Sequence, residues 1–166
     1  MAQNAEQDTT KTKYFILTYG CQMNVRDSEI IAGLLDSSGY MQANSPEDSD
    51  IVIFNTCSVR HSAENKVYGK LGEIAKMKRK NPRKAIAFGG CMAQLPEVRK
   101  RLKRQGVDIV FGTLNLHQLP YLIDQFRLYG KPVVEVWDKE GNVVEPLPSI
   151  RHTGISTFVN VMYGCN

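Results

Sequence analysis

Three cysteines occupy equivalent positions in three similar stretches of the sequence. Each follows a short, largely apolar run, and a helical pattern begins soon after it. The runs start at Tyr14, Ile51 and Ala85 and lead to Cys21, Cys57 and Cys91. A single cysteine at the end of an apolar run is usually a small buried hydrophobic residue. Three in the same position, among only four cysteines in the chain, indicate a site whose ligands are thiolates.

Two kinds of inorganic centre suit three thiolates. Zinc is held by cysteine sulfurs and would need a fourth ligand from elsewhere in the chain. A 4Fe-4S cluster held by three cysteines leaves one iron without a protein ligand and open to a substrate sulfur. The glycines before the cysteines (Gly20, Gly89 and Gly90) let the backbone pass close to a bulky centre. Helix amino termini after the cysteines would stabilise the thiolates.

Alternating strands and helices must position these cysteines. We predict strands at residues 13–19, 51–55, 84–88, 108–111 and 133–137, with a polar loop at 42–50. We predict helices from an N-cap at Asn24 to Ser38, from an N-cap at Ser58 to about Arg79, at 96–105, and from Leu119 to Gly130. The pattern is typical of an α/β fold: a parallel twisted sheet of about five strands with helices on both faces, Rossmann-like.

The cysteines are expected to meet at one edge of this sheet. Crossover connections keep the strands parallel, so every strand ends at the same edge, where open α/β sheets bind their ligands. Neighbouring strands lie about 4.8 Å apart, which places three adjacent strand ends within roughly 10–15 Å of one another. A dinucleotide site of the Rossmann type is disfavoured, because no G-x-G-x-x-G follows the first strand.

Composition is that of a globular protein, with 42% hydrophobic and 23% charged residues in 166. No apolar run approaches the ~20 residues of a membrane span, so we expect no membrane partner. Residues 1–12 have neither the apolar core of a signal peptide nor the arginines of a transit peptide. We therefore expect a disordered polar tail and a cytoplasmic protein.

Basic residues concentrate in two short stretches. Residues 76–84 include six Lys and Arg in nine, and residues 97–104 include five in eight. Such clusters bind phosphate backbones. They are also typical of helix carboxyl termini, where cations favour the helix dipole and solvate the surface. Spacing alone slightly favours the second interpretation, a solvated surface.

The pattern changes after about residue 138. Residues 139–156 are expected to be a linker, and residues 157–166 to begin a further strand that leads to Cys165. We expect the chain to be the amino-terminal part of a longer protein, with a first domain at 13–138 and the start of a second at 157–166.

Several motifs together resemble the radical-SAM methylthiotransferases, closest to the MiaB branch of that family. The resemblance runs from about residue 13 into the next domain, and the motifs are dense and in order. They are Thr18–Glu29 (TYGCQMNVRDSE), Asn55–Arg60 (NTCSVR), Ala63-Glu64, Lys66–Tyr68 (KVY), Gly90–Gln94 (GCMAQ) and Tyr163–Asn166 (YGCN).

The resemblance implies an enzyme of three domains. Cys21, Cys57 and Cys91 would hold an auxiliary 4Fe-4S cluster in the amino-terminal domain. Cys165 matches the first cysteine of the C-x-x-x-C-x-x-C motif, which holds a second 4Fe-4S cluster beside S-adenosylmethionine in a radical-SAM barrel. A carboxyl-terminal RNA-binding domain would follow. This chain alone is expected to be inactive, because it holds only one cysteine of the second motif.

The branch implies the reaction. It adds a methylthio group at C2 of N6-isopentenyladenosine, next to the anticodon (position 37) of tRNA, with an electron donor to reduce the cluster. Other branches act on threonylcarbamoyladenosine in tRNA or on an aspartate of a ribosomal protein. The enzyme is expected to be monomeric. Two rival hypotheses remain for the cysteines: a zinc-stabilised RNA-binding module without catalysis, and an electron-transfer domain with a fully coordinated cluster.

Overall fold

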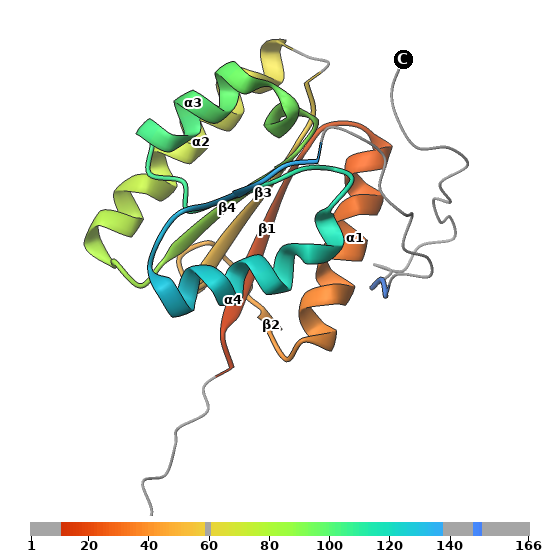
Figure 1. The fold of residues 1–166 in the computed structure, drawn as a ribbon, viewed down its shortest axis with the longest axis vertical. Coiled ribbons are helices and arrows are strands. Elements are labelled where there is room, and N and C mark those ends of the chain that lie inside the picture. Colours follow the sequence, from red (N-terminus) through yellow and green to blue (C-terminus); the bar gives the residue numbers. More distant parts are fainter. Residues whose placement is uncertain (1–10, 59–60, 138–147, 151–166) are drawn as a thin grey trace, which may run out of the picture.

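A computed structural model describes residues 11–58, 61–137 and 148–150 of the chain, without the side chains of 61–63. Strands and helices alternate along it (Figure 1). The strands are β1 (Lys13–Tyr19), β2 (Met41–Gln42), β3 (Ile51–Thr56), β4 (Ala85–Gly90), β5 (Ile109–Phe111) and β6 (Val133–Glu135). The α-helices are α1 (Gln22–Ser37), α2 (His61–Lys80), α3 (Pro96–Arg104) and α4 (Leu119–Tyr129), and short 3₁₀ helices are η1 (Cys91–Gln94) and η2 (Leu116–Gln118).

All six strands are parallel and form one sheet in the order β2-β1-β3-β4-β5-β6. The predicted α/β fold with a parallel sheet is confirmed. The sixth strand is β2, two residues long at the edge of the sheet. It begins just before the predicted loop at 42–50, and its length is too short to give a periodic pattern in the sequence.

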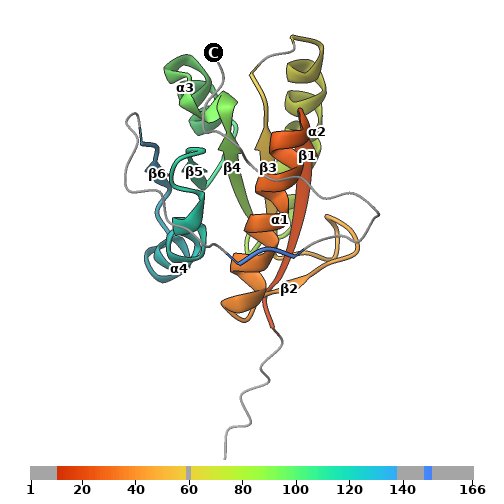
Figure 2. The ribbon, with the colours of Figure 1, turned by 90° about the vertical axis from the view of Figure 1, so that its right-hand side faces the viewer.

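The sheet separates two apolar cores. Along β3, Ile51 and Ile53 contribute to the core beneath α1 and α4, whereas Val52 and Phe54 contribute to the core beneath α2 and α3. This is the alternation that a strand imposes. Figure 1 shows α2 and α3 together on one face, and Figure 2 shows α1 in front of the other.

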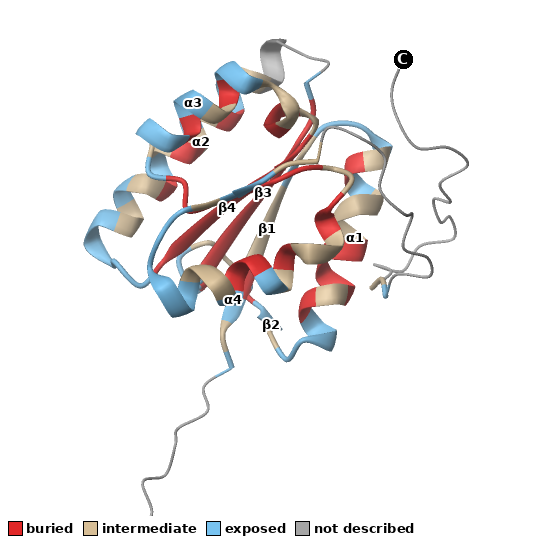
Figure 3. Cartoon of the chain, viewed as in Figure 1, coloured by how far each residue is buried: buried red, intermediate tan, exposed pale blue. Residues whose placement is uncertain are grey.

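Every residue of β3 and β4 is buried (Figure 3). Burying an aliphatic or aromatic side chain stabilises a fold by about 1.5–3 kcal/mol, so these central strands anchor the sheet. The two strands that lead to Cys57 and Cys91 are thus the most firmly held. In the described part of the chain, no helix is long and apolar enough to cross a membrane.

The first helix begins earlier than predicted. Its N-cap is Cys21, and Asn24 is the third residue of the helix rather than its cap. The prediction was wrong because Asn24 is 2% exposed and its amide bonds to β3. The Ser38-Gly39 stop is confirmed, since Ser38 is the C-cap.

The connection from β5 to β6 differs in hand from its neighbours. The β3–α2–β4 and β4–α3–β5 connections cross one face of the sheet, but α4 packs on the α1 face while β6 extends the sheet in the same direction. Crossovers between parallel strands are almost always right-handed, so a sheet whose crossovers differ in hand is rare. The buried side chain of Asn115 holds this turn, because its Oδ1 accepts from Gly112 N at 2.8 Å and its Nδ2 donates to Glu135 O at 2.8 Å.

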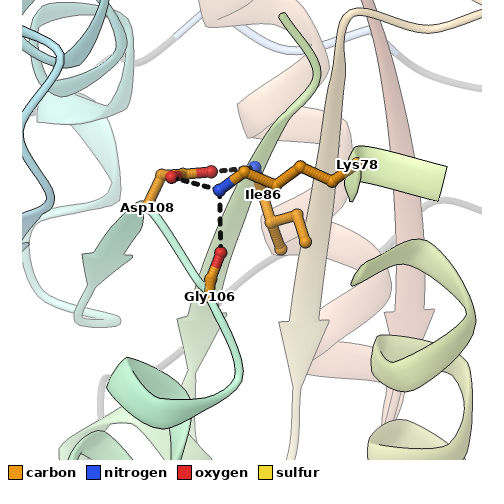
Figure 4. A network of polar contacts seen from close by, with 4 residues as sticks. All are labelled: Lys78, Ile86, Gly106 and Asp108. Atoms are coloured by element: carbon orange, nitrogen blue, oxygen red, sulfur yellow. Dashed lines mark hydrogen bonds and ion pairs between the residues drawn. The ribbon is translucent and has the colours of Figure 1, made fainter. Parts of the chain in front are cut away.

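A buried ion pair fastens α2 to the sheet (Figure 4). Lys78 Nζ lies 2.5 Å from Asp108 Oδ1 and donates to Gly106 O at 2.9 Å. The other carboxylate oxygen of Asp108 accepts from Ile86 N at 2.8 Å. One carboxylate therefore joins α2, β4 and the turn before β5.

Replacing Asp108 by alanine is expected to lower the free energy of unfolding by about 2–4 kcal/mol. The change leaves the Lys78 ammonium unpaired and the Ile86 amide without an acceptor. Glu73→Ala is the matched control, because it removes the carboxylate of an exposed i,i+3 pair with Lys70 and should cost under about 1 kcal/mol. Urea unfolding of both variants measures the difference, and equal losses would contradict the role given to Asp108.

Candidate metal centre

The three cysteines follow three adjacent strands in the middle of the sheet. Cys57 directly follows β3, Cys91 directly follows β4, and Cys21 lies two residues after β1. The strand register pairs Tyr19 with Thr56 and Thr56 with Gly90. The cysteines thus leave the sheet at nearly the same level, at the predicted edge.

This edge includes the switch point of the topology. The chain proceeds outward from β1 to β2 on one side and from β3 to β4 on the other. Sheets of this order bind their ligands in the crevice between the first and third strands. Cys21 and Cys57 flank that crevice, and Cys91 lies on the next strand.

The three thiols differ in exposure. Cys57 is 5% exposed, Cys91 is half-buried and Cys21 is exposed. The amino terminus of α1 begins at Cys21, so the positive end of the helix dipole lies at this edge, where it would favour an anionic centre. A centre bound by all three would be enclosed on the β3 side and accessible from the α1 side.

Gly20 brings the β1 end against the β3 end. A Cβ placed on Gly20 would lie 2.6 Å from Cys57 Cβ and 2.1 Å from Asn24 Oδ1. Such distances are well below van der Waals contact, so a side chain larger than hydrogen would separate the two strand ends. The close approach of Gly20, the residue before Cys21, to Cys57 therefore depends on the absence of a side chain at Gly20.

Gly90 does the same for the β4 end. Its φ is +91°, and a Cβ there would lie 2.1 Å from Thr56 O and 2.7 Å from Thr56 N. Both contacts are to backbone, which is unable to move aside as a flexible side chain would. Gly90, the residue before Cys91, thus packs directly against Thr56, the residue before Cys57.

Two buried amides connect α1 to the end of β3. Asn24 Oδ1 accepts from Cys21 N at 3.2 Å, and Asn24 Nδ2 donates to Asn55 Oδ1 and to Thr56 O, both at 3.1 Å. Asn55 Nδ2 donates to Asn24 O at 2.7 Å and to Ser28 Oγ at 2.9 Å. The first helix is therefore fixed to the strand directly before Cys57.

Thr56 extends this network to the third strand. Its Oγ1 donates to Gly89 O at 2.7 Å, so side-chain hydrogen bonds link all three cysteine-bearing ends. Sequence reasoning assigned no role to Asn55 and gave Asn24 the wrong one. The signal available was a polar residue at the end of the otherwise apolar run Ile51–Thr56, which requires a partner when buried.

Asp27 faces the same edge of the sheet. It lines a small pocket with Asn55, Gly90, Phe111 and Thr113. Burial raises the pKa of Asp27 to about 6, although the neighbouring Arg26 opposes the shift. Asp27 lies in the second turn of α1 and lines this pocket beside Gly90, the residue before Cys91.

The donor set fits an iron–sulfur cluster. Within the described residues, no three side chains of His, Cys, Asp or Glu lie close enough to hold a single metal ion. A zinc ion requires sulfurs about 2.3 Å from one point, whereas in a cluster each cysteine binds a different iron. The three thiols follow adjacent strands whose ends pack closely at Gly20 and Gly90, and they suit a cluster that binds each thiolate at a different iron. Cys165 lies outside the described residues.

Known proteins match the chain over most of its length. The family described as "Uncharacterized protein family UPF0004" matches residues 13–112. The chain is 65% identical over 161 residues to a Syntrophomonas wolfei subsp. wolfei protein named tRNA-2-methylthio-N(6)-dimethylallyladenosine synthase, covering 97% of this chain and 36% of that protein. Proteins of the same name from Bacillus thuringiensis and Bacillus cereus are 48% identical over 159 residues, covering 95% of this chain and 31% of theirs. The chain spans about a third of the length of these curated relatives.

Replacing Gly90 by alanine is expected to destabilise the domain much more than replacing Gly106. Both glycines have positive φ, +91° and +77°, but a Cβ on Gly106 would meet nothing within 4 Å. Gly106→Ala should cost about 1–2 kcal/mol from backbone strain alone. Gly90→Ala should cost at least about 3 kcal/mol, because strain and the clash with Thr56 add. Urea unfolding compares them, and equal losses would refute the close packing at Thr56.

Asp27 is expected to make stability fall as pH rises from about 4 to about 6. Its pKa in the folded chain is about 6, above the ~3.9 of an unfolded aspartate, so the folded state binds the extra proton. That contribution is complete below pH 4 and is lost as pH rises through 6. Asp27→Asn should remove this pH dependence and raise stability at pH 7 by about 1–3 kcal/mol. Urea unfolding at pH 4, 5, 6 and 7 tests it, and an unchanged pH profile would show that Asp27 titrates normally.

Proposed function

The chain belongs to the UPF0004 family, the amino-terminal domain of the radical-SAM methylthiotransferases, and from this membership we propose that it serves a tRNA methylthiotransferase. The resemblance expected from the motifs is thus confirmed at the level of the family. The proposed reaction adds a methylthio group at C2 of N6-isopentenyladenosine at position 37 of tRNA. The names of the relatives support it, and the alignment of Cys21, Cys57 and Cys91 on three adjacent strand ends carries it.

The three cysteines would hold the auxiliary 4Fe-4S cluster. Bound through three thiolates, such a cluster keeps one iron open and supplies the sulfur chemistry of the reaction. The number of ligands favours this over structural zinc, because zinc would need a fourth protein ligand whereas a 4Fe-4S cluster can be held by three thiolates. An electron-transfer domain would instead need a fourth protein ligand.

The residues around the cysteines have positioning roles. Asn24 and Asn55 hold the helix that carries Cys21 in register with the strand that carries Cys57. The dipole of α1 stabilises negative charge at Cys21. Burial of Cys57 excludes water from the β3 side, while the exposed α1 side leaves an approach for substrate.

The remaining parts of the enzyme are proposed from the family. Residues 13–138 form the methylthiotransferase domain, 139–156 the linker and 157–166 the start of the radical-SAM barrel. Cys165 would be the first ligand of the second 4Fe-4S cluster, beside S-adenosylmethionine. The substrate is tRNA, an electron donor reduces the cluster, and the enzyme acts as a monomer in the cytoplasm. This chain alone is expected to be inactive.

Anaerobic reconstitution with iron and sulfide should load about four irons per chain. Cys57→Ala should abolish the visible absorption of the cluster, because it removes the buried ligand. Cys165→Ala is the matched control and should keep both the iron and the absorption, since Cys165 belongs to a different site.

Three results would count against this assignment. Tight stoichiometric zinc without cluster uptake would favour a zinc-stabilised RNA-binding module. Loss of iron in Cys165→Ala would favour an electron-transfer domain with four cysteine ligands. Retention of the full spectrum in Cys57→Ala would remove the buried ligand from the site. Added methylthiolate should perturb the spectrum of the loaded wild-type chain, as an open iron requires.

A further inference from the structure

Charge is distributed unequally between the two faces of the sheet. Helices α2 and α3, on one face, carry eleven Lys and Arg but only three Asp and Glu. Helices α1 and α4, on the other, carry two Arg and four Asp and Glu. The modest net charge of +4 for the chain therefore hides one strongly basic face.

Some of these cations have structural roles. Lys78 pairs with Asp108, and Lys70 pairs with Glu73. Arg99 donates to the carbonyls of Ala93 and Gln94 at 3.2 and 3.1 Å, and the guanidinium of Arg101 lies 3.5 Å from the centre of the Tyr68 ring. These side chains hold parts of the α2–α3 layer together.

Seven further cations on these helices have no such role. They are exposed, and no hydrogen bond or ion pair joins their side chains to any described part of the chain. One of them, Lys66, lies near the amino terminus of α2. We call the other six the basic face: Lys76, Arg79, Lys80, Lys100, Lys103 and Arg104. Each helix contributes three, at positions i, i+3 and i+4. Like charges at these spacings repel and destabilise a helix, so folding does not explain the arrangement.

The helix dipole explains only part of it. Cations in the last turn of a helix are favourable, but the effect fades within that turn. The last turn of α2 contains Arg79 and Lys80 but not Lys76, and that of α3 contains Lys103 and Arg104 but not Lys100. In both helices the cationic row extends beyond the turn that the dipole accounts for.

The two rows form one surface. Arg101 on Tyr68 and Lys78 on Gly106 connect α3 and the turn after it to α2, and Figure 1 shows the two helices together on this face. Residues 76–80 lie shortly before β4, and residues 100–104 shortly before β5. The basic face therefore lies toward the edge where strands begin, opposite the cysteines. A helix of 20 residues such as α2 separates its two ends by roughly 30 Å.

We propose that the basic face binds the phosphate backbone of a base-paired RNA stem, remote from the base that reacts at the cysteine edge. This inference rests on the proposed function for the identity of the partner as tRNA. Double helices rise about 3 Å per base pair, so ~30 Å corresponds to roughly ten base pairs of a structured RNA. The contacts would add affinity and orientation without reading sequence.

A membrane surface fits this face less well. Helices that bind membranes pair a cationic face with exposed apolar side chains. The apolar side chains Val67, Leu71, Val98 and Leu102 of α2 and α3 are buried in the core. The exposed large hydrophobic residues of the described chain all lie outside these two helices: Val25, Met41, Tyr121, Leu128, Tyr129 and Val134.

The test is the salt dependence of RNA binding by the full 166-residue chain. An unmodified tRNA transcript is the probe, and its dissociation constant is measured from about 50 to 200 mM KCl. Lys76→Ala/Lys80→Ala and Lys100→Ala/Lys103→Ala each remove two cations of the basic face. The matched control Lys11→Ala/Lys131→Ala removes two exposed cations elsewhere. Each test variant should weaken binding at least ~5-fold near 0.1 M salt and reduce the log–log slope by about 1.4–1.8.

The control variant should keep the wild-type affinity to within ~2-fold and change the slope by less than ~0.5. If the test and control variants weakened tRNA binding equally, the loss would follow from net charge alone, and the proposal would be overturned. So would binding to vesicles of phosphatidylserine and phosphatidylcholine without binding to tRNA. Iron loading separates this failure from failure of the proposed function. The lysine variants should load the cluster normally, and Cys57→Ala should bind tRNA with the wild-type slope.

Discussion

The buried amides of Asn24 and Asn55 constrain the cysteine edge. Each is at most 2% exposed, so each must satisfy its hydrogen-bonding groups within the protein or lose about 1–3 kcal/mol. They do so by bonding to one another and to the backbone on either side, which leaves one relative position for α1 and β3. Cys21 and Cys57 inherit that position because each lies within three residues of an amide. Gly20 and Gly90 lack the Cβ atoms that would otherwise keep the strand ends apart.

The parallel sheet separates two tasks. Strand ends meet at one edge, where backbone amides, helix amino termini and thiols gather, and helix carboxyl termini and the starts of strands meet at the other. The first edge suits an anionic centre and the second suits cations, because the helix dipoles have opposite signs there. The chain follows this division, with cysteines at one edge and the basic face toward the other.

Much of this could be predicted from the sequence because the signals were local. Apolar runs located β1 and β3 to within a residue, and alternation with helices made the strands parallel, so the common edge of the cysteines followed. The role of Asn24 could not be predicted, because it depends on a partner 31 residues away. The strand β2 was too short to give a pattern, and the face on which α4 packs follows from contacts of Leu119, Leu122 and Ile123 with the α1 side of the core. The missed features are all long-range contacts or very short elements.

Charge clusters illustrate the same limit. Residues 76–84 appear as one run of six cations in the sequence, yet the fold divides them by function. Lys78 bonds to Asp108, and Lys84 is 3% exposed with its ammonium bonded to the carbonyls of Pro46, Glu47 and Ser49. Burial lowers the pKa of Lys84, and the nearby carboxylates of Asp50, Glu47 and Asp48 oppose the shift. Lys76, Arg79 and Lys80 have no such partner, and their i, i+3 and i+4 spacing distinguishes them from Lys78 on the same helix. A run of like charges therefore becomes interpretable only when each cation has been assigned a partner, and those left without one are the candidates for an external ligand.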